Sequence, residues 1–326
     1  FTNFRHFIPS FFTASIIPSQ CSLSTSLGYN GIMVNKLHSK YKILTWNILY
    51  SPNFLERLPE IARLIKNSKA DIALLQEINT AYTVEAVAAF DQIGYKLHLD
   101  DKLGKKICVG IAYNPTVFTA VDQESSLDVP FRAMSLDLVP TGQGIIRRTP
   151  TYITPDGDHH RDTPLSYASN ILTVISYHGH WGGLYQAERL AEVAQIDQFA
   201  GNKSNAVIIG GDFNATPNEP AISYLRGDTL HGDEGTMWVD SQILSRELSG
   251  TTPYNTSLTH GSMVEANSKL DLDWLPERRI DYLLSYGYSY GRPYGFDGRY
   301  HDPSLSRART LSDHAPVIAG LLSLDR

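Results

Sequence analysis

IIGGDFNATP, residues 208–217, is the stretch in which a buried strand passes directly into polar side chains. Residues 206–209 form a short apolar run of the kind that makes a buried strand. We expect the two glycines that follow to let the backbone turn tightly and approach a substrate closely. Asp212 and Asn214 then place a carboxylate and an amide at the end of this strand. The stretch therefore predicts a strand end that carries chemistry.

The same arrangement recurs along the chain, where apolar runs repeatedly end in Asn, Asp, Glu or His. A single junction of this kind is weak evidence for a site, because such residues also cap strands and turns. Several junctions together place oxygen ligands and imidazoles along one rim of packed sheets. The strand-end residues are Asn47, Glu77, His178, Asp212 with Asn214, Asp281, and the pair Asp313-His314. We therefore predict that these side chains meet in one site.

Between the junctions, short apolar runs alternate with amphipathic segments. The pattern predicts strands at 41–48, 71–75, 108–113, 171–177, 206–209, 280–285 and 317–322, and helices at 55–65 and 186–199. Many strands and few helices indicate an α/β domain in which sheets pack face to face with helices outside. Residues 140–169 and 227–275 are predicted to be long loops, which often select the substrate.

Five segments resemble, in order, the motifs of the endonuclease/exonuclease/phosphatase superfamily, which has the DNase-I-like fold. They are TWNIL (45–49), LLQEI (74–78), IIGGDFNATP (208–217), RRIDYLL (278–284) and LSDHAPV (311–317). The resemblance implies a four-layered α/β sandwich of two packed mixed β-sheets flanked by helices, with the site at the top of the sheets. It also implies a metal-dependent phosphoric ester hydrolase that uses Mg²⁺, or Mn²⁺ in its place.

The resemblance assigns a role to each matching residue. Asn47 and Glu77 match the family's metal-binding positions, and Asp313 matches a residue near the metal. Asp212 matches the residue that orients or deprotonates the attacking water. Asn214 matches an amide that donates a hydrogen bond to the phosphate. This set suits Mg²⁺, which usually takes one or two protein carboxylates and keeps several waters.

Two histidines complete the implied catalytic set. His314 matches the catalytic histidine, and Asp281 matches the carboxylate that holds it and favours the imidazolium beside the phosphate oxygens. A further histidine of the family ends the central strand and contacts the scissile phosphate. The segment SYHGHW offers both His178 and His180 for this role. The strand phase favours His178, and His180 stays open as the alternative.

The substrate is less determined, because this fold serves many unrelated substrates. We favour a nucleic acid or nucleotide phosphodiester, cleaved by in-line attack of water. A phosphatase or phospholipase-type hydrolase of a small phosphoester, such as an inositol phosphate or sphingomyelin, is the alternative. A non-catalytic binding module on the same fold is the alternative of another class. Such a module is expected to lack Glu77, Asp212 or His314, and all three are present.

Candidate substrate-binding residues lie in the predicted loops and beside the strand-end histidine. They are His180, Arg147, Arg148, Trp238 and Tyr254. Aromatic rings stack on bases in many nucleic-acid-binding proteins, although packing against the domain is a commoner use for a loop aromatic residue.

The composition limits the partners. The chain has 326 residues and a formal net charge of −6, whereas proteins that bind nucleic acid mainly through its phosphates are usually basic. Tight, non-specific DNA binding is therefore not expected. Cys21 and Cys108 do not suggest a disulfide framework or a thiolate metal site. No run approaches the ~18 apolar residues of a membrane span, and no protein partner can be inferred.

Residues 1–40 differ from the rest, since they contain no Asp or Glu and many Ser and Thr. We expect this segment to be an N-terminal extension outside the catalytic fold, and residues 41–326 to form the catalytic domain. The extension has some features of an organelle transit peptide. Alternatively, it lies upstream of a true start at Met33. An intracellular, soluble protein is favoured, with import into an organelle as the alternative.

Overall fold

The structure is a computed structural model. It describes residues 39–100, 105–125, 133–143, 170–203, 205–231, 236, 238–241, 279–286, 294–300 and 308–323. All of these belong to one compact unit, Leu37–Arg326. Nearly all of the predicted N-terminal extension lies outside the described residues. The first strand begins at Ser39 and so takes in the last two residues of that segment.

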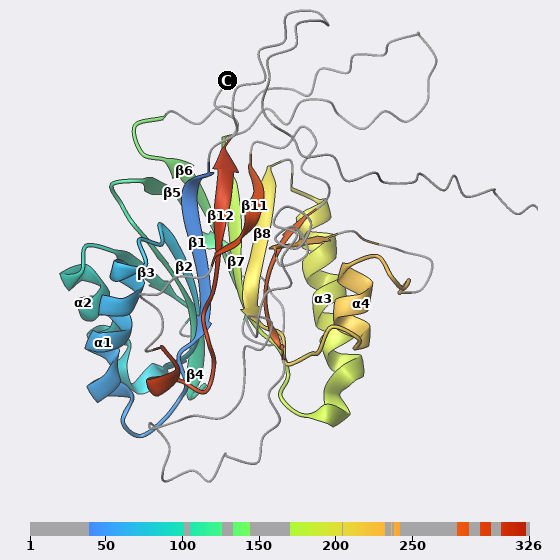
Figure 1. Cartoon of the computed structure of the whole chain (residues 1–326), viewed down its shortest axis with the longest axis horizontal. Coiled ribbons are helices and arrows are strands. Elements are labelled where there is room, and N and C mark those ends of the chain that lie inside the picture. The colour runs from blue at the N-terminus through green and yellow to red at the C-terminus, as the bar shows by residue number, and fades with distance from the viewer. Residues whose placement is uncertain are drawn as a thin grey trace, which may run out of the picture. The chain divides into compact units, whose positions relative to one another are not determined.

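Two six-stranded sheets form the centre of this unit (Figure 1). The first sheet has the order β11-β12-β1-β2-β4-β3. Its strands are β1 (Ser39–Asn47), β2 (Ile72–Asn79), β3 (Lys96–Leu99), β4 (Ile107–Tyr113), β11 (Tyr294–Tyr300) and β12 (Val317–Ser323). The second sheet has the order β5-β6-β7-β8-β10-β9. Its strands are β5 (Phe118–Ser125), β6 (Ala133–Pro140), β7 (Leu172–His178), β8 (Ala206–Asp212), β9 (Trp238–Asp240) and β10 (Asp281–Tyr286).

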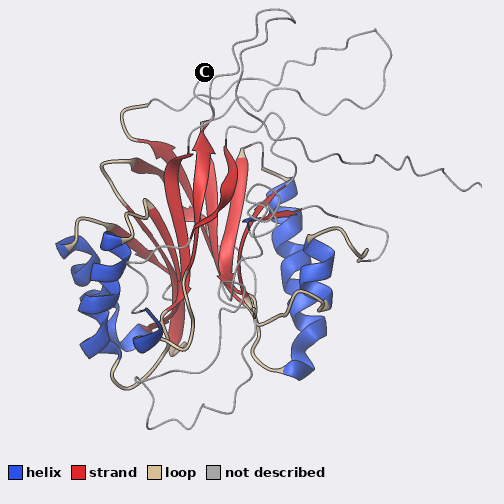
Figure 2. Cartoon of the chain, in the orientation of Figure 1, coloured by secondary structure: helices blue, strands red, loops and turns tan. Residues whose placement is uncertain are grey.

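Helices cover the outer faces of the two sheets (Figure 2). Helices α1 (Phe54–Asn67) and α2 (Thr83–Gln92) pack on the first sheet, and α3 (Gln186–Gly201) and α4 (Pro220–Leu225) pack on the second. Short 3₁₀ turns are η1 (Thr80–Tyr82), η2 (Gly183–Tyr185) and η4 (Ala308–Thr310). Each sheet is mixed, because β1 pairs with β2 and β7 with β8 in parallel, while the other described pairs are antiparallel.

The alternation of strand side chains creates three apolar interfaces from these four layers. In β1, Ile43 packs between the two sheets, whereas Leu44 packs toward α1 and α2. In β8, Ile208 packs between the sheets and Ile209 packs toward α3 and α4. Both strands are buried on both faces, which explains their continuous apolar sequences. The expected four-layered α/β sandwich is therefore confirmed.

The predicted strands and helices are all present, with boundaries that differ by a few residues. The pattern did not predict β3, β5, β6, β11, α2 or α4. The segment 227–275 was wrongly predicted to be loop throughout, because it contains β9, which pairs with β10. The other predicted loop, 140–169, lies almost entirely outside the described residues.

Gly210 and Gly211 do not form the tight turn expected of them. Both lie inside β8, and neither has a positive φ. A Cβ atom at Gly211 would lie 1.9 Å from the carbonyl oxygen of Tyr177 on the neighbouring strand. The glycines therefore allow close packing beside the site rather than a close approach to substrate.

Among the described residues, no helix combines the length and the apolar character needed to cross a membrane.

Candidate active site

Strand pairing aligns three of the predicted residues in the second sheet. In the parallel pair β7–β8, His178 lies opposite Asp212, and in the antiparallel pair β8–β10, Asp212 lies opposite Asp281. Residues directly opposite one another on adjacent strands place their side chains on the same face. The register therefore brings an imidazole and two carboxylates from distant parts of the sequence into one row.

The first sheet contributes Asn47 and Glu77. Asn47 is the last residue of β1. Glu77 lies at an irregularity in the β2–β4 pairing, between Leu75 and Ile78, and has a φ of 61°. Few residues other than glycine adopt this left-handed conformation, and the bulge redirects the side chain out of the strand's alternation. The backbone N–H of Tyr50 donates to Glu77 Oε2 at 2.7 Å and holds the carboxylate in place.

Asn47 joins the carboxylates of the two sheets. Its Nδ2 donates to Glu77 Oε1 at 3.1 Å and to Asp212 Oδ2 at 3.0 Å. The Nε2 atom of His178 lies 3.6 Å from each of the same two carboxylate oxygens. Asn47, His178 and Asp212 are all buried. The ends of β1, β2, β7 and β8 thus converge on one polar cluster between the sheets.

Asn214 extends the cluster beyond the end of β8. Its backbone has a φ of 50°, and its N–H donates to Asp212 Oδ1 at 2.8 Å. Its Nδ2 donates to the carbonyl oxygen of Gly179 at 3.1 Å and lies 3.4 Å from Asp212 Oδ2. The turn after β8 therefore orients Asp212 and ties it to the loop after β7.

His314 faces Asp212 from the other side. Its Nδ1 lies 2.8 Å from Asp281 Oδ2, and its Nε2 lies 3.6 Å from Asp212 Oδ2 and 3.9 Å from Asp313 Oδ1. Burial by itself would lower the pKa of His314, but the carboxylates of Asp281 and Asp212 outweigh it and raise that pKa well above its usual value. The arrangement therefore favours an imidazolium that directs an N–H toward Asp212.

Asp212 is the centre of the cluster. Burial raises its pKa to about 7, although the positive charge on His314 opposes the rise, as do the hydrogen bonds from Asn214 and Asn47. The nearby charge on Asp281 adds to the rise. A carboxylate with a pKa near neutrality can exchange a proton with water at physiological pH.

The donors suit a hard divalent cation. The carboxylates of Glu77 and Asp212 and the imidazole of His178 place ligand atoms within 4.8 Å of one another. The side chain of Glu77 is 21% exposed, which leaves room for the waters that Mg²⁺ keeps. Asn47 Oδ1 accepts from the N–H of Leu49 at 3.0 Å, so this amide presents its Nδ2 to the cluster. Asp313 lies beside His314 rather than between the carboxylates.

Three further polar residues support the cluster and were not predicted. Arg57 on α1 donates to the carbonyl oxygens of Ile48, Leu49 and Leu311, and so connects the loop after β1 to the turn before His314. Burial lowers the pKa of Arg57 to about 10, against the raising effect of Asp313 and Glu77. The sequence offered one signal for the role of Arg57, because Arg57 is a charged residue within the apolar periodicity of a predicted helix.

Ser312 and Gln76 connect elements beneath the site. Ser312 Oγ donates to the carbonyl oxygen of Asn47 at 2.6 Å and accepts from the N–H of His314 at 3.1 Å. Gln76 Nε2 donates to Ser176 Oγ at 3.1 Å across the two sheets. Both residues belong to the quoted motifs, but their roles depend on contacts between distant strands.

Of the candidate substrate-binding residues, the structure describes His180 and Trp238, and neither belongs to the polar cluster. His180 turns away from it, since its Nδ1 lies 2.5 Å from Glu192 on α3. Trp238 was wrongly predicted to face substrate, because it is only 2% exposed and its Nε1 donates to Asp197 at 2.8 Å. Its indole packs in the apolar interface beneath α3 and α4. Arg147, Arg148 and Tyr254 lie outside the described residues.

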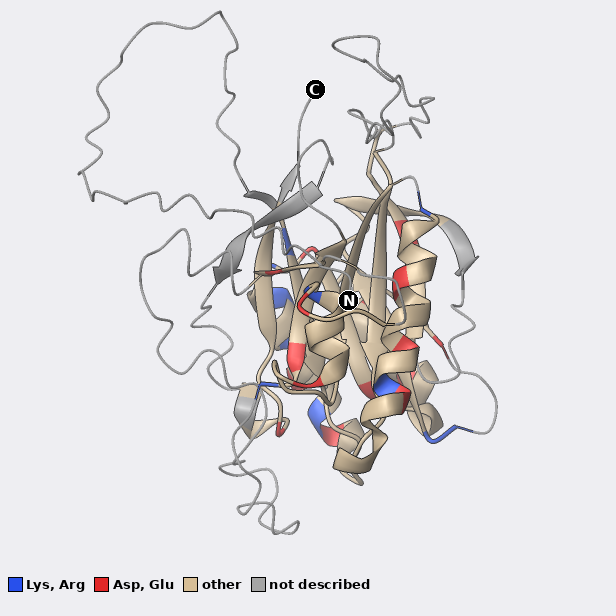
Figure 3. Ribbon diagram, turned by 90° about the vertical axis from the view of Figure 1, so that its right-hand side faces the viewer, with Lys and Arg blue, Asp and Glu red and all other residues tan. Residues whose placement is uncertain are grey.

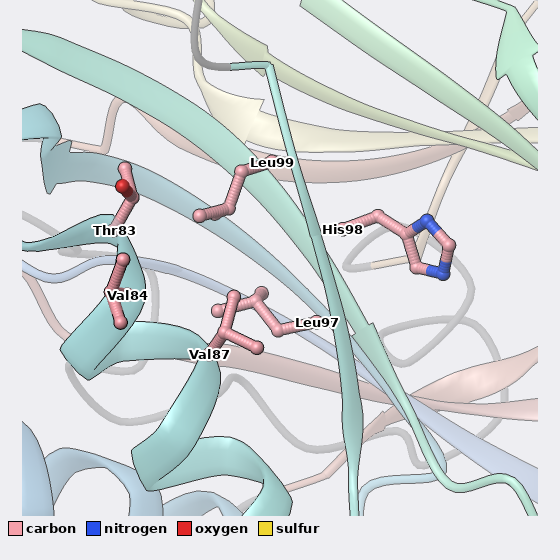
Figure 4. A pocket seen from close by; sticks show the side chains of 6 residues that line it. All are labelled: Thr83, Val84, Val87, Leu97, His98 and Leu99. Atoms are coloured by element: carbon pink, nitrogen blue, oxygen red, sulfur yellow. The ribbon is translucent and has the colours of Figure 1, made fainter.

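A separate hollow of about 460 Å³ lies between α2 and β3 (Figure 4). Leu97 and Leu99 point toward Val87 on α2, whereas His98 points to the opposite side of the strand. The lining contains none of the strand-end polar residues. The hollow is therefore distinct from the polar cluster.

Solved structures with this fold include TDP2, nocturnin and ANGEL2. Humanized TDP2 of D. rerio is 16% identical, with a TM-score of 0.60 over 88% of this chain and 100% of that one. The catalytic domain of human nocturnin, with a bound sulfate anion, is 15% identical, with a TM-score of 0.57 over 89% and 96%. ANGEL2, a 2′,3′-cyclic phosphatase in complex with adenosine-2′,3′-vanadate, is 15% identical, with a TM-score of 0.55 over 87% and 95%. At these identities the likeness shows the fold alone.

None of the curated proteins compared with this chain matches its sequence. Residues 44–314, however, match the Endonuclease/Exonuclease/phosphatase family, and this range begins in β1 and ends at His314. It therefore includes every strand end that contributes to the polar cluster. The chain belongs to the Endonuclease/Exonuclease/phosphatase family.

Proposed function

We propose that this chain is a divalent-metal-dependent phosphodiester hydrolase that acts on a nucleic acid or nucleotide by in-line attack of water. The main support for the proposal is the set of polar side chains that surround Asp212. This buried carboxylate lies within 3.6 Å of an amide and two imidazoles, contributed by both sheets. Phosphoryl transfer requires mainly positioning and charge stabilisation, which such a preorganised polar cluster provides.

Asp212 is proposed to orient the attacking water and accept its proton, since a pKa of about 7 suits a general base. His314, held by Asp281 at 2.8 Å, supplies a positive N–H donor for the phosphate oxygens. His178 and Asn214 are proposed to donate further hydrogen bonds to the phosphate. For Asn214, this requires its amide to exchange one of its present acceptors for a phosphate oxygen.

Glu77 is proposed to hold the cation together with water, beside the neighbouring Asp212 and His178. We propose that Asn47 and Asp313 also act at the metal position, Asn47 through its hydrogen bond to Glu77 Oε1 and Asp313 through its negative charge. The bound cation, Mg²⁺ or Mn²⁺, would neutralise charge on the phosphate and polarise it for attack.

Two structures of this fold support a nucleic acid or nucleotide substrate. TDP2 of D. rerio was solved with a single-strand DNA product, and ANGEL2 with an adenosine vanadate. Because the chain has a net charge of −6, we do not expect it to bind a long stretch of nucleic-acid backbone through its phosphates. On α3, Glu188, Glu192 and Asp197 outnumber Arg189 (Figure 3). We therefore propose recognition of a short segment around one phosphate.

Hydrolysis of a substrate panel tests the proposal. The panel holds single- and double-stranded DNA, RNA, a 5′-tyrosyl oligonucleotide, an adenosine 2′,3′-cyclic phosphate, an inositol polyphosphate, sphingomyelin and bis-p-nitrophenyl phosphate. Each is incubated with Mg²⁺, with Mn²⁺ and with EDTA, and Asp212→Asn is assayed in parallel. Metal-dependent cleavage of a nucleic acid or nucleotide, absent in the variant, is the expected result.

Two outcomes would contradict the proposal. Cleavage confined to the inositol phosphate or to sphingomyelin would assign the site to a small phosphoester. Binding of a panel member by the folded protein, without cleavage under any metal condition, would favour the binding module. Asp228→Asn, a change of an exposed carboxylate after α4, serves as the control for charge alone.

A further inference from the structure

The loop between β7 and α3, residues 179–185, is unusual in what it exposes. It contributes three of the seven large apolar side chains that are exposed among the described residues. The exposed fractions are 74% for Trp181, 94% for Leu184 and 44% for Tyr185. A large apolar group left in water is unfavourable, so a concentration of such groups on one short loop indicates a binding surface.

This loop is held firmly to the active site. The N–H of Gly179 donates to the carbonyl oxygen of Asp212 at 2.8 Å, and Asn214 donates to the carbonyl oxygen of Gly179 at 3.1 Å. A Cβ atom at Gly179 would lie 2.6 Å from the carbonyl oxygen of Phe213. Glycine therefore lets the loop start directly against the turn that carries Asp212 and Asn214.

The middle of the loop is fixed by α3. The buried Arg189 guanidinium donates to the carbonyl oxygens of His180 at 3.0 Å and Gly182 at 2.7 Å. The His180 ring is held by Glu192 and stacks on Tyr185, with centroids 5.4 Å apart. The backbone is thus well anchored while the side chain of Trp181 is left exposed. Preorganisation of this kind reduces the entropy lost when a ligand binds.

The position of Trp181 limits what it can contact. It is three residues beyond His178, so the two Cα atoms are at most about 11 Å apart. At this distance, an indole directed toward the Asp212 cluster would reach a group joined to a phosphate there. The neighbouring helix α3 carries the exposed Glu188 in its first turn, which would repel further phosphates or an anionic lipid surface. The chemistry on this side of the site therefore favours an uncharged, flat group.

We propose that Trp181 is a substrate-binding residue that stacks on the base of the nucleotide next to the scissile phosphate. This inference rests on the proposed function and names the part of the substrate that the loop recognises. Every base has an aromatic face, so stacking tolerates any sequence. It also adds affinity without phosphate contacts.

The test compares two oligonucleotides that differ only in the base beside the cleaved phosphate. One carries an intact base and the other an abasic tetrahydrofuran residue. We expect Trp181→Ala to lower kcat/KM on the intact oligonucleotide by about 10- to 100-fold, the range of one lost base stack. The loss on the abasic oligonucleotide should be much smaller, and Trp181→Phe should restore most of the activity. Leu230→Ala, which removes a 66% exposed side chain elsewhere, is the matched control.

A binding measurement separates this inference from the catalytic proposal. The Kd of a labelled single-stranded oligonucleotide is measured by fluorescence anisotropy in an Asp212→Asn background, with and without Trp181→Ala. Equal Kd values, or equal losses on the intact and abasic oligonucleotides, would overturn the stacking role while leaving the hydrolase proposal intact. If the wild type cleaves no nucleic acid or nucleotide, the proposed function itself fails.

A lipid-facing loop would give a different pattern. Sedimentation with phosphatidylcholine–sphingomyelin vesicles provides that comparison. Vesicle binding by the wild type that is lost in Trp181→Ala, with no change in oligonucleotide Kd, would overturn the inference.

Discussion

The units β1–α1–β2 and β7–α3–β8 are built alike and lie on the two sides of the active site. In each, two parallel strands are joined through a helix, and the first strand ends in a polar site residue, Asn47 or His178. The second strand supplies a carboxylate, Glu77 or Asp212. The fourth residue of the helix is a buried arginine, Arg57 or Arg189, which holds the loop that precedes it.

The two units differ in the surroundings of the carboxylate. The side chain of Glu77 is 21% exposed, whereas that of Asp212 is 2% exposed. An accessible carboxylate can bind a hydrated cation, and a buried one has its pKa raised and can accept a proton. Burial, rather than residue type or position in the unit, therefore separates the two proposed roles, which are cation binding by Glu77 and proton acceptance by Asp212.

The largest expected effect comes from neutralising each carboxylate in turn. Glu77→Gln and Asp212→Asn should each lower kcat by on the order of 10³-fold, because each removes a charge that acts on the transition state. The two losses should differ in kind. Raising the Mn²⁺ concentration should recover part of the activity of Glu77→Gln and none of that of Asp212→Asn.

Steady-state rates across a metal titration measure this difference, and Glu60→Gln on α1 is the control. The same metal response in both variants would show that metal binding and proton acceptance are not separated between Glu77 and Asp212.

The next effect concerns the histidines of the second unit. His178→Gln should lower kcat by about 10²-fold or more, because it removes a donor beside Asp212 and Glu77. His180→Gln should change kcat by no more than a few-fold, since His180 contacts Glu192 instead. Measurement of both variants on one substrate decides between them. A larger loss in His180→Gln would mean that His180 reaches the phosphate when substrate binds.

The buried arginines should affect stability more than the chemistry. Arg57→Met and Arg189→Met are each expected to cost about 2–4 kcal/mol of unfolding free energy, because buried acceptors lose their donor. Arg57→Met should also lower kcat by about tenfold, since Arg57 holds both the loop after Asn47 and the turn before His314. Arg63→Met, an exposed arginine on the same helix, should leave both properties unchanged.

Thermal unfolding and kcat of the three variants are the measurements. If Arg189→Met lowered kcat more than Arg57→Met, the proposal that Arg57 holds two active-site segments in place would be wrong.

The last prediction concerns a pH dependence of stability caused by Asp212. Its pKa in the folded protein is about 7, above its ordinary value of 3.8, so its favourable contribution is complete below about pH 4 and disappears as the pH rises through 7. In EDTA, the stability of wild type relative to Asp212→Asn should therefore fall between pH 4 and pH 7. Urea unfolding at several pH values gives the difference. A difference that stayed constant, or rose with pH, would show that Asp212 is ionised throughout this range.

The site was largely predictable because its residues follow apolar strands. Glu77 and Asp212 each follow a run that the sequence marks as buried, and Asp281 begins one. The antiparallel register then aligns Asp281 with Asp212. The phase of β7 also favoured His178 over His180, and the structure brings His178 to the carboxylates. The individual roles of these residues remain predictions.

Other features depended on contacts that no local pattern contains. Arg57 reads as one polar position on an amphipathic helix, yet it connects segments about 250 residues apart. Trp238 reads as a loop aromatic residue, yet strand pairing with β10 and the hydrogen bond to Asp197 bury it. The short strand β3, with four residues, gives too little alternation to be recognised.

The sequence by itself predicted the strands that carry the site, the face-to-face packing of sheets and the set of polar strand ends, because alternation and apolar runs indicate which faces are buried. The four-layered arrangement was implied by the resemblance of five segments to a known family. Only the tertiary structure decided how exposed each carboxylate is and which loop side chains remain in water. Both depend on packing between distant segments: the two sheets enclose Asp212, and Arg189 fixes the loop that exposes Trp181.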